Sequence, residues 1–379
     1  MSTEKFAVTG DLHLAPNAWV KHPTLCDDAY DSFGQITQYC CERRLPLLIL
    51  GDIFDKAKPD SHSVTFFSNC MDAFRTERIS VYYVQGDHDY AGEHPWAGVH
   101  AWPTHVHKQS FMIGGMRMYG LDWTPRANTE EELALIPGNH DALATHLAWS
   151  EVQGIGNTDA DISMVYSVDK ILSGDYHVHG GFSGTNAQGV PTRVWSPGST
   201  CMQATDEPSD KYFFTAIQED DGMWRFEDTP LITRSFHLAD IWDSTDLDTF
   251  VGELRDDSLG LLPEDPQRRK PLVRVKFNAA RPEAISRIRE AAGDRYHLFE
   301  EPQYDDDEEV IDLETAPEGA FDSLLTAIQE LAANRPELYN DLSRLLRSND
   351  KEAELDAMYE EFKAETQASA GNETCAASN

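Results

Sequence analysis

Eight aspartate and histidine residues each follow a short apolar run of the sequence, where a strand of a sheet would end. They are Asp11, His13, Asp52, Asp87, His88, His146, Asp175 and His177. Carboxylates and imidazoles are ligands for Mn-, Fe- or Zn-type ions, and one aspartate can bridge two such ions. Any one of these residues alone would be read as a turn, cap or surface residue. Their joint pattern (Asp-x-His, Gly-Asp-x-x-Asp, Gly-x-His-Asp, His, Gly-x-x-His) predicts a site for divalent cations, which can activate water for hydrolysis.

The segments between these residues predict the sheet that must position them. Apolar runs at residues 5–9, 45–50 and 79–84 predict buried strands, and residues 29–44 and 62–76 between them predict helices. Further strands are predicted within residues 111–123, 141–149, 170–180, 192–199 and 211–218. Such alternation indicates an α/β fold, and open α/β sheets bind their ligands at the carboxyl ends of the strands.

This pattern resembles the calcineurin-like metallophosphoesterase superfamily. The stretch "VWSPGSTCMQATDEPSDKYFF" (194–214) is similar to the Pro-Gly-Ser segment of SbcD-type DNA repair nucleases, with an acidic residue and a lysine before the next strand. "GDIFD" (51–55) is close to their second motif. The resemblance implies an α/β fold, namely a four-layer β-sandwich flanked by helices, with a small α+β capping domain and C-terminal helices. It covers residues 5–220 well and 235–295 more weakly.

The resemblance also implies a role for each candidate residue. The first metal ion would take Asp11, His13, Asp52 and His177, and the second would take Asp52, Asp87, His146 and Asp175. His88 would stabilise or protonate the leaving oxygen, as a general acid does. Asp55 or Asp89 would orient His88.

Two stretches of the sequence compete for the loop that carries this histidine. Residues 138–141 spell the family motif Gly-Asn-His-Asp, whereas residues 86–89 have Asp87 in place of the asparagine. The active loop of the family follows the third strand, and the run at 79–84 is such a strand. The stretch before 138 contains Pro137, and the motif there directly precedes the strand that would deliver His146. We therefore interpret residues 86–89 as the active loop and residues 138–141 as a turn before a strand.

The candidate site departs from the family at a second position. The usual Gly-His-x-His is replaced by Gly174-Asp175-Tyr176-His177, so that Asp175 stands where a histidine ligand is expected. An alternative register would use His177 and His179 and would lose the glycine. We prefer the first register because an apolar strand at 170–174 ends in that glycine. Two extra carboxylates make the site richer in oxygen, which favours two Mn ions, or Mg as the alternative, over Zn.

Composition and what the resemblance implies together divide the chain into five predicted parts. Residues 1–235 are predicted to form the metallophosphoesterase domain and residues 236–298 the capping, DNA-binding domain. In the latter, Val273, Val275 and Phe277 alternate with basic residues, as in a half-exposed strand. Residues 299–315 are predicted as an acidic linker, 316–365 as a helical segment that docks a partner, and 366–379 as a disordered tail.

The charge of the chain bears on its substrate. The formal net charge is −35, which opposes nonspecific binding to nucleic acid or anionic membranes. Residues 268–289 nevertheless contain eight basic residues against Glu283 alone. From this stretch we predict the DNA-binding residues Arg268, Arg269, Lys270, Arg274 and Lys276. The alternative is that the stretch is an ordinary solvated strand–helix face.

Two classes of function follow from these observations. The first is a Mn-dependent DNA exonuclease or endonuclease subunit, of bacteria or a bacteriophage, in an SbcCD-like recombination and repair complex. The resemblance implies an SbcC-type ABC ATPase as its partner and allows a homodimer. The second is a stand-alone phosphatase or nucleotide phosphodiesterase. A cytoplasmic location is expected, because the six cysteines show no paired spacing and the sequence has neither a signal-peptide core nor an apolar membrane span.

Overall fold

The computed structural model describes residues 3–16, 27–89, 96–153, 158–204, 207–261, 270–278 and 282–303. The helices are α1 (Asp28–Arg43), α2 (Ser61–Glu77), α3 (Arg126–Ala134), α4 (Ser150–Gln153), α5 (Ser244–Asp256) and α6 (Pro282–Ala292), with 3-10 turns at Trp96–Val99 and Ile162–Met164. The strands are β1 (Thr3–Thr9), β2 (Leu47–Leu50), β3 (Val81–Val84), β4 (Thr104–His105), β5 (Gln109–Ile113), β6 (Met116–Leu121), β7 (Ala142–His146), β8 (Lys170–Gly174), β9 (Gly180–Thr185), β10 (Pro191–Ser196), β11 (Tyr212–Gln218), β12 (Trp224–Pro230), β13 (Phe236–Ile241), β14 (Leu272–Asn278) and β15 (His297–Gln303).

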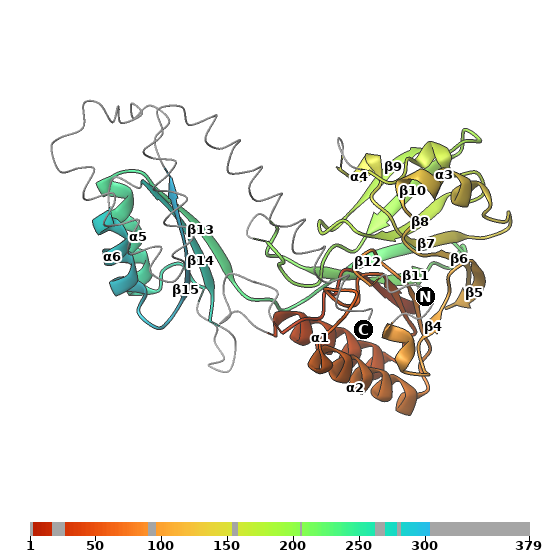
Figure 1. Cartoon of the computed structure of the whole chain (residues 1–379), viewed down its shortest axis with the longest axis horizontal. Helices are drawn as coiled ribbons and strands as arrows, with labels where there is room; N and C mark the ends of the chain where they lie inside the picture. The colour runs from red at the N-terminus through yellow and green to blue at the C-terminus, as the bar shows by residue number, and fades with distance from the viewer. Residues whose placement is uncertain are drawn as a thin grey trace, which may run out of the picture. The chain divides into compact units, whose positions relative to one another are not determined.

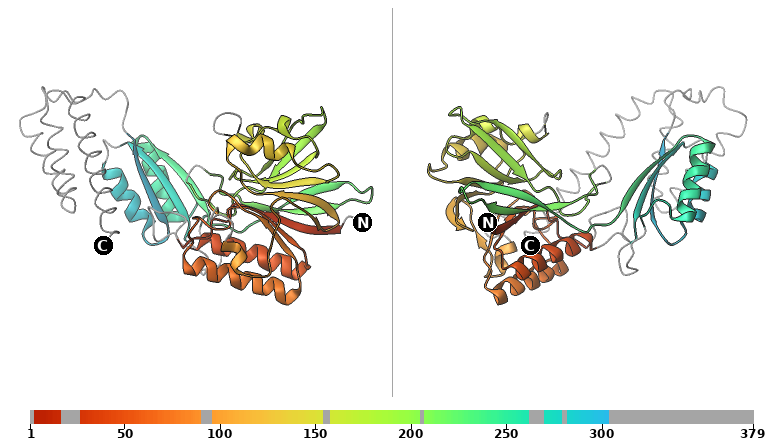
Figure 2. Two further views of the ribbon diagram at one scale, coloured as in Figure 1. Left: turned by 45° about the vertical axis from the view of Figure 1, so that its right-hand side comes forward. Right: turned by 180° about the vertical axis from the view of Figure 1, so that it is seen from behind.

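Two six-stranded sheets lie face to face in the larger body of the molecule. The first has the order β12-β11-β1-β2-β3-β4 and the second the order β5-β6-β7-β8-β10-β9. Helices α1 and α2 cover the outer face of the first sheet, while α3 and α4 lie on the far side of the second (Figures 1 and 2). The predicted four-layer α/β architecture is therefore confirmed for the described residues.

Alternating side chains on the central strands create the apolar layers between these sheets and helices. On β2, Leu47 and Ile49 pack against α1 and α2, whereas Leu48 and Leu50 pack against the second sheet. Strands buried on both faces are expected to be continuously apolar, as β2 is. A third apolar cluster, which includes the fully buried Trp149, lies on the far side of the second sheet. These layers leave the strands little freedom to move and so hold their ends in place.

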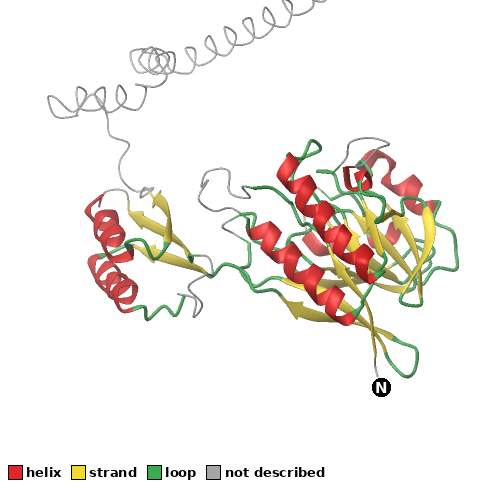
Figure 3. Ribbon diagram, turned by 90° about the horizontal axis from the view of Figure 1, so that it is seen from below, coloured by secondary structure: helices red, strands yellow, loops and turns green. Residues whose placement is uncertain are grey.

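The two long helices run side by side across the first sheet (Figure 3). The side chain of Asp60 caps α2 by accepting hydrogen bonds from the backbone N–H groups of His62 and Ser63. Phe33 of α1 stacks on Phe67 of α2 with ring centroids 6.1 Å apart. This contact joins the two helices beneath the loop that follows β2.

A separate three-stranded sheet, β13-β14-β15, carries α5 and α6 on one of its faces (Figure 1). Val273, Val275 and Phe277 of β14 are buried against these helices, while Arg274 and Lys276 on the opposite face are partly exposed. The predicted half-exposed strand is therefore confirmed. Strand β15 continues to Gln303, so its last five residues occupy the start of the stretch that the sequence predicts as an acidic linker.

Several elements differ from the sequence-based expectation. Residues 111–123, predicted as one strand-bearing segment, hold parts of both strands of a hairpin that turns at Gly114 and Gly115, both of which have positive φ. Strands β9 and β12 were not predicted. The helical segment 316–365, the tail 366–379 and most of the linker lie outside the described residues, as do Arg268 and Arg269. Of the helices that the structure describes, none has the length and apolar character needed to cross a bilayer.

Candidate metal centre

The carboxyl ends of five strands deliver the predicted ligands to one place. β1, β2 and β3 are parallel to one another in the first sheet, and β7 and β8 are parallel in the second. Of the residues at these ends, Asp11, His13, Asp52 and Asp175 all have positive φ. Left-handed backbone is uncommon for residues other than glycine and clusters at functional sites. The chain thus turns sharply just past β1, β2 and β8 and aims a polar side chain into the junction.

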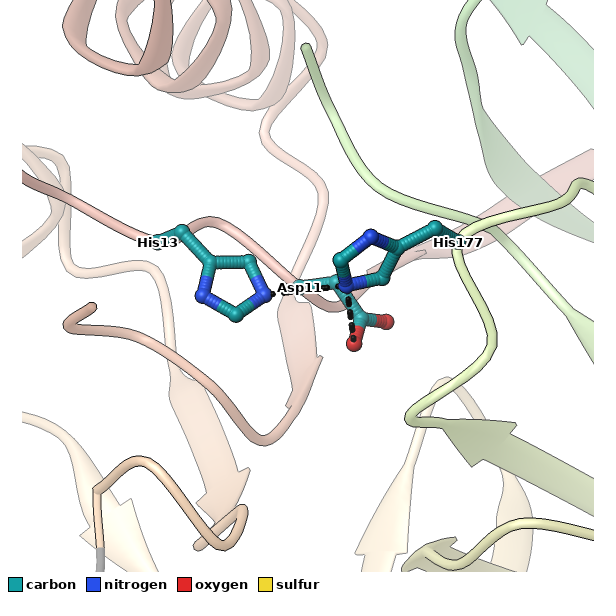
Figure 4. Close-up of side chains that lie close together, drawn as sticks. All are labelled: Asp11, His13 and His177. Atoms are coloured by element: carbon teal, nitrogen blue, oxygen red, sulfur yellow. Dashed lines mark hydrogen bonds and ion pairs between the residues drawn. The ribbon is translucent and has the colours of Figure 1, made fainter. Parts of the chain in front are cut away.

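One group of candidate ligands consists of Asp11, His13 and His177 (Figure 4). The Nε2 atoms of His13 and His177 face each other at 3.1 Å, and His177 Nε2 lies 4.0 Å from Asp11 Oδ1. Asp11 and His13 are buried, and His177 is partly exposed. Asp11 Oδ1 also accepts a hydrogen bond of 3.0 Å from the backbone N–H of Asp175. That bond connects the end of β1 to the end of β8.

His146 is the centre of a second group of candidate ligands. Its Nδ1 lies 2.7 Å from the carbonyl oxygen of Leu50, which can only accept a hydrogen bond, so Nδ1 carries the proton. Its Nε2 is thereby aimed at three carboxylates, 3.6 Å from Asp52, 3.5 Å from Asp87 and 3.6 Å from Asp175. Because Leu50 ends β2 and His146 ends β7, this side chain joins the two sheets directly at the site.

The donor set fits divalent cations. Within the described residues, four overlapping groups have ligand atoms within 4.8 Å of one another: Asp11–His13–His177, His13–Asp52–His88, Asp11–Asp52–His146 and Asp87–His146–Asp175. Asp11 Oδ2 and His146 Nε2 are buried and have no hydrogen-bond partner. Buried polar atoms are normally satisfied, so two orphaned atoms that converge with further carboxylates are best explained as ligands. All seven predicted metal ligands lie in these groups.

Burial changes the protonation of these groups. Burial raises the pKa of Asp52 to about 8, more than the nearby His146 lowers it. Burial lowers the pKa of His13 well below its usual value, and His177 and His88 add to the effect. For His146, burial lowers the pKa, but the carboxylates of Asp52, Asp87 and Asp11 outweigh it and raise the pKa well above the usual value. Without a cation, the pair of Asp52 and His146 therefore retains a proton near neutral pH.

His88 lies at the exposed side of this cluster. Its Nδ1 is 2.8 Å from the backbone carbonyl of Asp55, and its ring meets that of His13 edge to face with centroids 5.0 Å apart. The sequence suggested that Asp55 or Asp89 orients His88. In the structure the contact to His88 comes from the Asp55 backbone, whereas the Asp89 carboxylate accepts hydrogen bonds from the N–H groups of Ile53, Phe54 and Gly86. Asp89 therefore stabilises the loops that carry the ligands.

The second Gly-Asn-His-Asp stretch lies outside the cluster. His140 is buried, its Nδ1 is 2.8 Å from the carbonyl of Pro137, and its Nε2 is 2.7 Å from Ser110 Oγ. Asp141 accepts a hydrogen bond from the backbone N–H of Arg117. No residue of 138–141 occurs in the four candidate groups of the described chain. These contacts are those of a turn that leads into β7.

The structure also bears on the choice between Asp175 and His179. Asp175 belongs to the group around His146, whereas His179 Nε2 lies 3.0 Å from Asp228 and its ring packs on Tyr212 and Phe214. Gly174 precedes Asp175 where there is no room for a side chain, because a Cβ atom would collide with the carbonyl oxygen of Leu50. The geometry favours the register that keeps this glycine and uses Asp175.

Three polar residues beside the cluster were not singled out from the sequence. Glu207 Oε1 lies 2.7 Å from His177 Nδ1, and Lys211 Nζ donates to Glu207 Oε2 and to Ser199 Oγ, each at 2.7 Å. Burial raises the pKa of Glu207, but His177 and Lys211 outweigh it and lower the pKa to about 2, so Glu207 is ionised. The sequence signal was the Pro-Gly-Ser segment with its acidic residue and lysine, whose contact with His177 only the fold reveals.

The predicted DNA-binding stretch is largely paired with acidic side chains where it is described. Arg274 contacts Glu301 at 2.6 Å, Arg287 contacts Asp248 at 2.7 Å, and Arg289 contacts Glu300 through two hydrogen bonds. Arg274 lies on β14 and the other two arginines lie on α6, so the excess of positive charge counted along the sequence is partly neutralised in this small domain.

The register around Gly174 predicts the behaviour of substitutions at Asp175. We expect Asp175→Ala to lose one of two bound Mn equivalents, because the group around His146 loses a ligand. Asp175→His should retain both, with a weaker preference for Mn and Mg over Zn, because imidazole is a softer ligand than carboxylate. His179→Ala is the matched control and should keep the wild-type metal content. Metal analysis after dialysis measures each case, and loss of metal in His179→Ala but not in Asp175→Ala would reverse the assignment.

The protonation of the cluster predicts that metal binding releases protons. Because Asp52 and His146 have raised pKa values without a cation, a cation must displace their protons near neutral pH. Mn affinity should therefore rise as the pH is raised from about 6 to about 8, following the pKa values of these groups. Calorimetry in two buffers of different ionisation enthalpy measures the protons released. A heat of binding that is the same in both buffers near neutral pH would contradict the expectation.

Comparison with known proteins places the first part of this chain. Residues 4–120 match the family model of calcineurin-like phosphoesterases. No curated protein sequence matches the chain. Among solved structures, one crystal structure is 11% identical with a TM-score of 0.37, and that of TT1561 of Thermus thermophilus is 12% identical with a TM-score of 0.30. Each match covers 60% of this chain and 99% of the other. The family match over residues 4–120, together with the candidate ligand groups, indicates that this chain is a metal-dependent phosphoesterase, a hydrolase.

Proposed function

We propose that this chain is the nuclease subunit of an SbcCD-like recombination and repair complex and cleaves DNA phosphodiester bonds with two divalent ions, preferentially Mn. The observation that carries the proposal is the meeting of buried Asp11, Asp52 and His146 at the junction of two sheets. Buried carboxylates beside imidazoles form the kind of ligand set that such ions require.

The ligands divide into two overlapping sets that share Asp52. The first ion would be held by Asp11, His13, Asp52 and His177, and the second by Asp52, Asp87, His146 and Asp175. When bound, two such ions would polarise the phosphate and lower the pKa of a water molecule that attacks it. The hydrogen bond from His146 to Leu50 and that from Asp175 N–H to Asp11 keep the two sets in a fixed relation.

His88 is placed to handle the leaving group. Its Nδ1 proton is donated to the carbonyl of Asp55, so Nε2 is the atom that can exchange a proton with substrate. Burial lowers the pKa of His88, but the Asp55 carbonyl and the carboxylates of Asp52 and Asp87 outweigh it and raise the pKa. A histidine whose pKa is raised and whose side chain is exposed to solvent is suited to protonating the leaving oxygen.

Two features support DNA as the substrate. The Pro-Gly-Ser segment, which resembles that of SbcD-type nucleases, contacts the cluster through the hydrogen bond between Glu207 and His177. A small α+β domain with basic side chains on its sheet follows the phosphoesterase domain, as a capping domain would. Phosphate contacts from lysine and arginine supply most of the affinity of proteins for DNA.

The net charge of the chain favours a second candidate, a stand-alone phosphatase or nucleotide phosphodiesterase. A formal net charge of −35 repels a polyanion, and Arg274, Arg287 and Arg289 already pair with acidic side chains. A small phosphate ester could reach the cluster without contacting the small domain. The two candidates differ in the substrate that they require.

Assays with Mn on linear double-stranded DNA and on a small chromogenic phosphodiester test the function and the role of His88 together. Wild type should cleave both. His88→Ala should lower the rate by about 10²- to 10⁴-fold, the usual contribution of a general acid, and should still bind two Mn ions. His140→Ala, the matched control from the second Gly-Asn-His-Asp stretch, should retain activity close to wild type.

Each alternative outcome has a distinct meaning. Turnover of the chromogenic ester without any cleavage of DNA would favour the stand-alone phosphoesterase. Loss of Mn from His88→Ala would make His88 a ligand in the group with His13 and Asp52. Activity that survives His88→Ala but not His140→Ala would reverse the choice of active loop.

The partner is predicted from residues outside the described structure. In the sequence, Phe321, Leu324, Leu325, Ile328 and Leu331 form an apolar stripe at helical spacing beyond the acidic linker. We propose that this stripe docks on an SbcC-type ABC ATPase, as amphipathic helices dock in apolar grooves.

Deleting residues 316–379 tests the docking proposal. The truncated chain should stay folded, should keep its Mn-dependent hydrolysis and should no longer co-purify with a co-expressed SbcC-type ATPase that retains the full-length chain. Thermal melting provides the control for folding. Aggregation or a much earlier melt of the truncated chain would instead assign the stripe to this protein's own core.

A further inference from the structure

A buried ion pair stands directly behind one candidate metal ligand. Lys211 is 3% exposed and its Nζ lies 2.7 Å from Glu207 Oε2. The other carboxylate oxygen, Glu207 Oε1, lies 2.7 Å from His177 Nδ1. Lysine is almost never fully buried unless it is paired, because burying its charge costs free energy. The burial of Lys211 is therefore explained by its ion pair with the Glu207 carboxylate.

The hydrogen bonds to Glu207 leave one oxygen for His177. Oε2 accepts from Lys211 Nζ, from Ser199 Oγ at 2.9 Å and from the backbone N–H of Gln203 at 3.2 Å. Lys211 also donates to Ser199, which closes a triangle of three side chains. The carboxylate is thus held in one orientation with Oε1 directed at the imidazole.

This orientation determines which nitrogen of His177 can bind a cation. An ionised carboxylate only accepts hydrogen bonds, so Nδ1 of His177 must carry the proton. The lone pair of the neutral ring is then on Nε2, the atom that lies 3.1 Å from His13 Nε2 and 4.0 Å from Asp11 Oδ1. His177 is itself partly exposed and follows β8 in a loop, and its ring meets that of His13 edge to face with centroids 5.0 Å apart.

We propose that Glu207, held by Lys211 and Ser199, is a positioning residue that directs His177 Nε2 toward the first metal ion. The inference rests on the proposed function, in which His177 is a ligand. The positive charge of Lys211 balances that of Glu207, so the pair orients the ring without adding net charge to a site that already has four carboxylates. Hydrogen-bond partners of metal-binding histidines are worth about 10- to 100-fold in metal affinity.

The test measures Mn binding by calorimetry in the full-length chain. Glu207→Ala should weaken Mn binding at one of two sites by about 10- to 100-fold, and Glu207→Gln should lie between Glu207→Ala and wild type because its amide oxygen still accepts from Nδ1. Activity of Glu207→Ala should return close to wild type at saturating Mn, since the ligands and His88 remain. Glu227→Ala is the matched control, because Glu227 pairs with Arg225 on an exposed hairpin and should leave affinity unchanged.

The outcomes separate this inference from the proposed function. Absence of Mn binding by wild type would overturn the proposed function itself. Wild-type binding with equal affinity in a folded Glu207→Ala would overturn only the role of Glu207, as would a lowered rate that saturating Mn does not restore. Should Glu207→Ala fail to fold, Glu207→Gln and Ser199→Ala decide: both should weaken Mn binding in the same direction, and unchanged affinity in both would reject the inference.

Discussion

The burial of several carboxylates at one point is the constraint on which the rest of this structure depends. Asp11 and Asp52 are almost fully enclosed, and Asp87 and Asp175 stand beside them across His146. Carboxylates in a protein interior are costly unless a cation or strong hydrogen bonds compensate them. Protonation of the carboxylates and the imidazole of His146 offset this cost. In the function proposed here, two metal ions would offset it as well.

The layered fold meets this constraint by making the strand ends rigid. Apolar layers on both faces of β2 leave its end no freedom, and His146 fastens that end to β7 by its hydrogen bond to Leu50. The backbone at Gly86 also lies close to the side chain of Asp52, because a Cβ atom on Gly86 would collide with the carboxylate of Asp52. The left-handed backbone at Asp11, His13 and Asp52 is tolerated because the surrounding hydrogen bonds over-determine it.

The residues around the cluster have separate tasks. Asp89 accepts hydrogen bonds from backbone N–H groups of the loops, and Glu207 lies against Nδ1 of His177. His88 lies at the exposed side of the cluster, where a substrate would arrive. In the function proposed here, this separation would keep the proton-transferring His88 apart from the most buried ligands. By contrast, the histidine of the Gly-Asn-His-Asp stretch at 138–141 is engaged by Ser110 and by the carbonyl of Pro137.

Much of the fold and of the candidate cluster could be predicted from the sequence, because apolar runs and the polar residues after them are local features. The strands before Asp11, Asp52 and Asp87 and the two helices between them were recognised in this way. Tertiary structure alone decided three matters: that the Gln109–Leu121 region folds back as a hairpin, that the arginines of the small domain meet acidic partners, and that Glu207 lies behind His177. The arginine pairs and the contact of Glu207 with His177 depend on residues far apart in sequence. The hairpin depends on a turn at two glycines, and the apolar pattern does not encode the direction of that turn. Spacing along the chain reports which residues share an element, whereas contacts between elements follow only from how the layers pack.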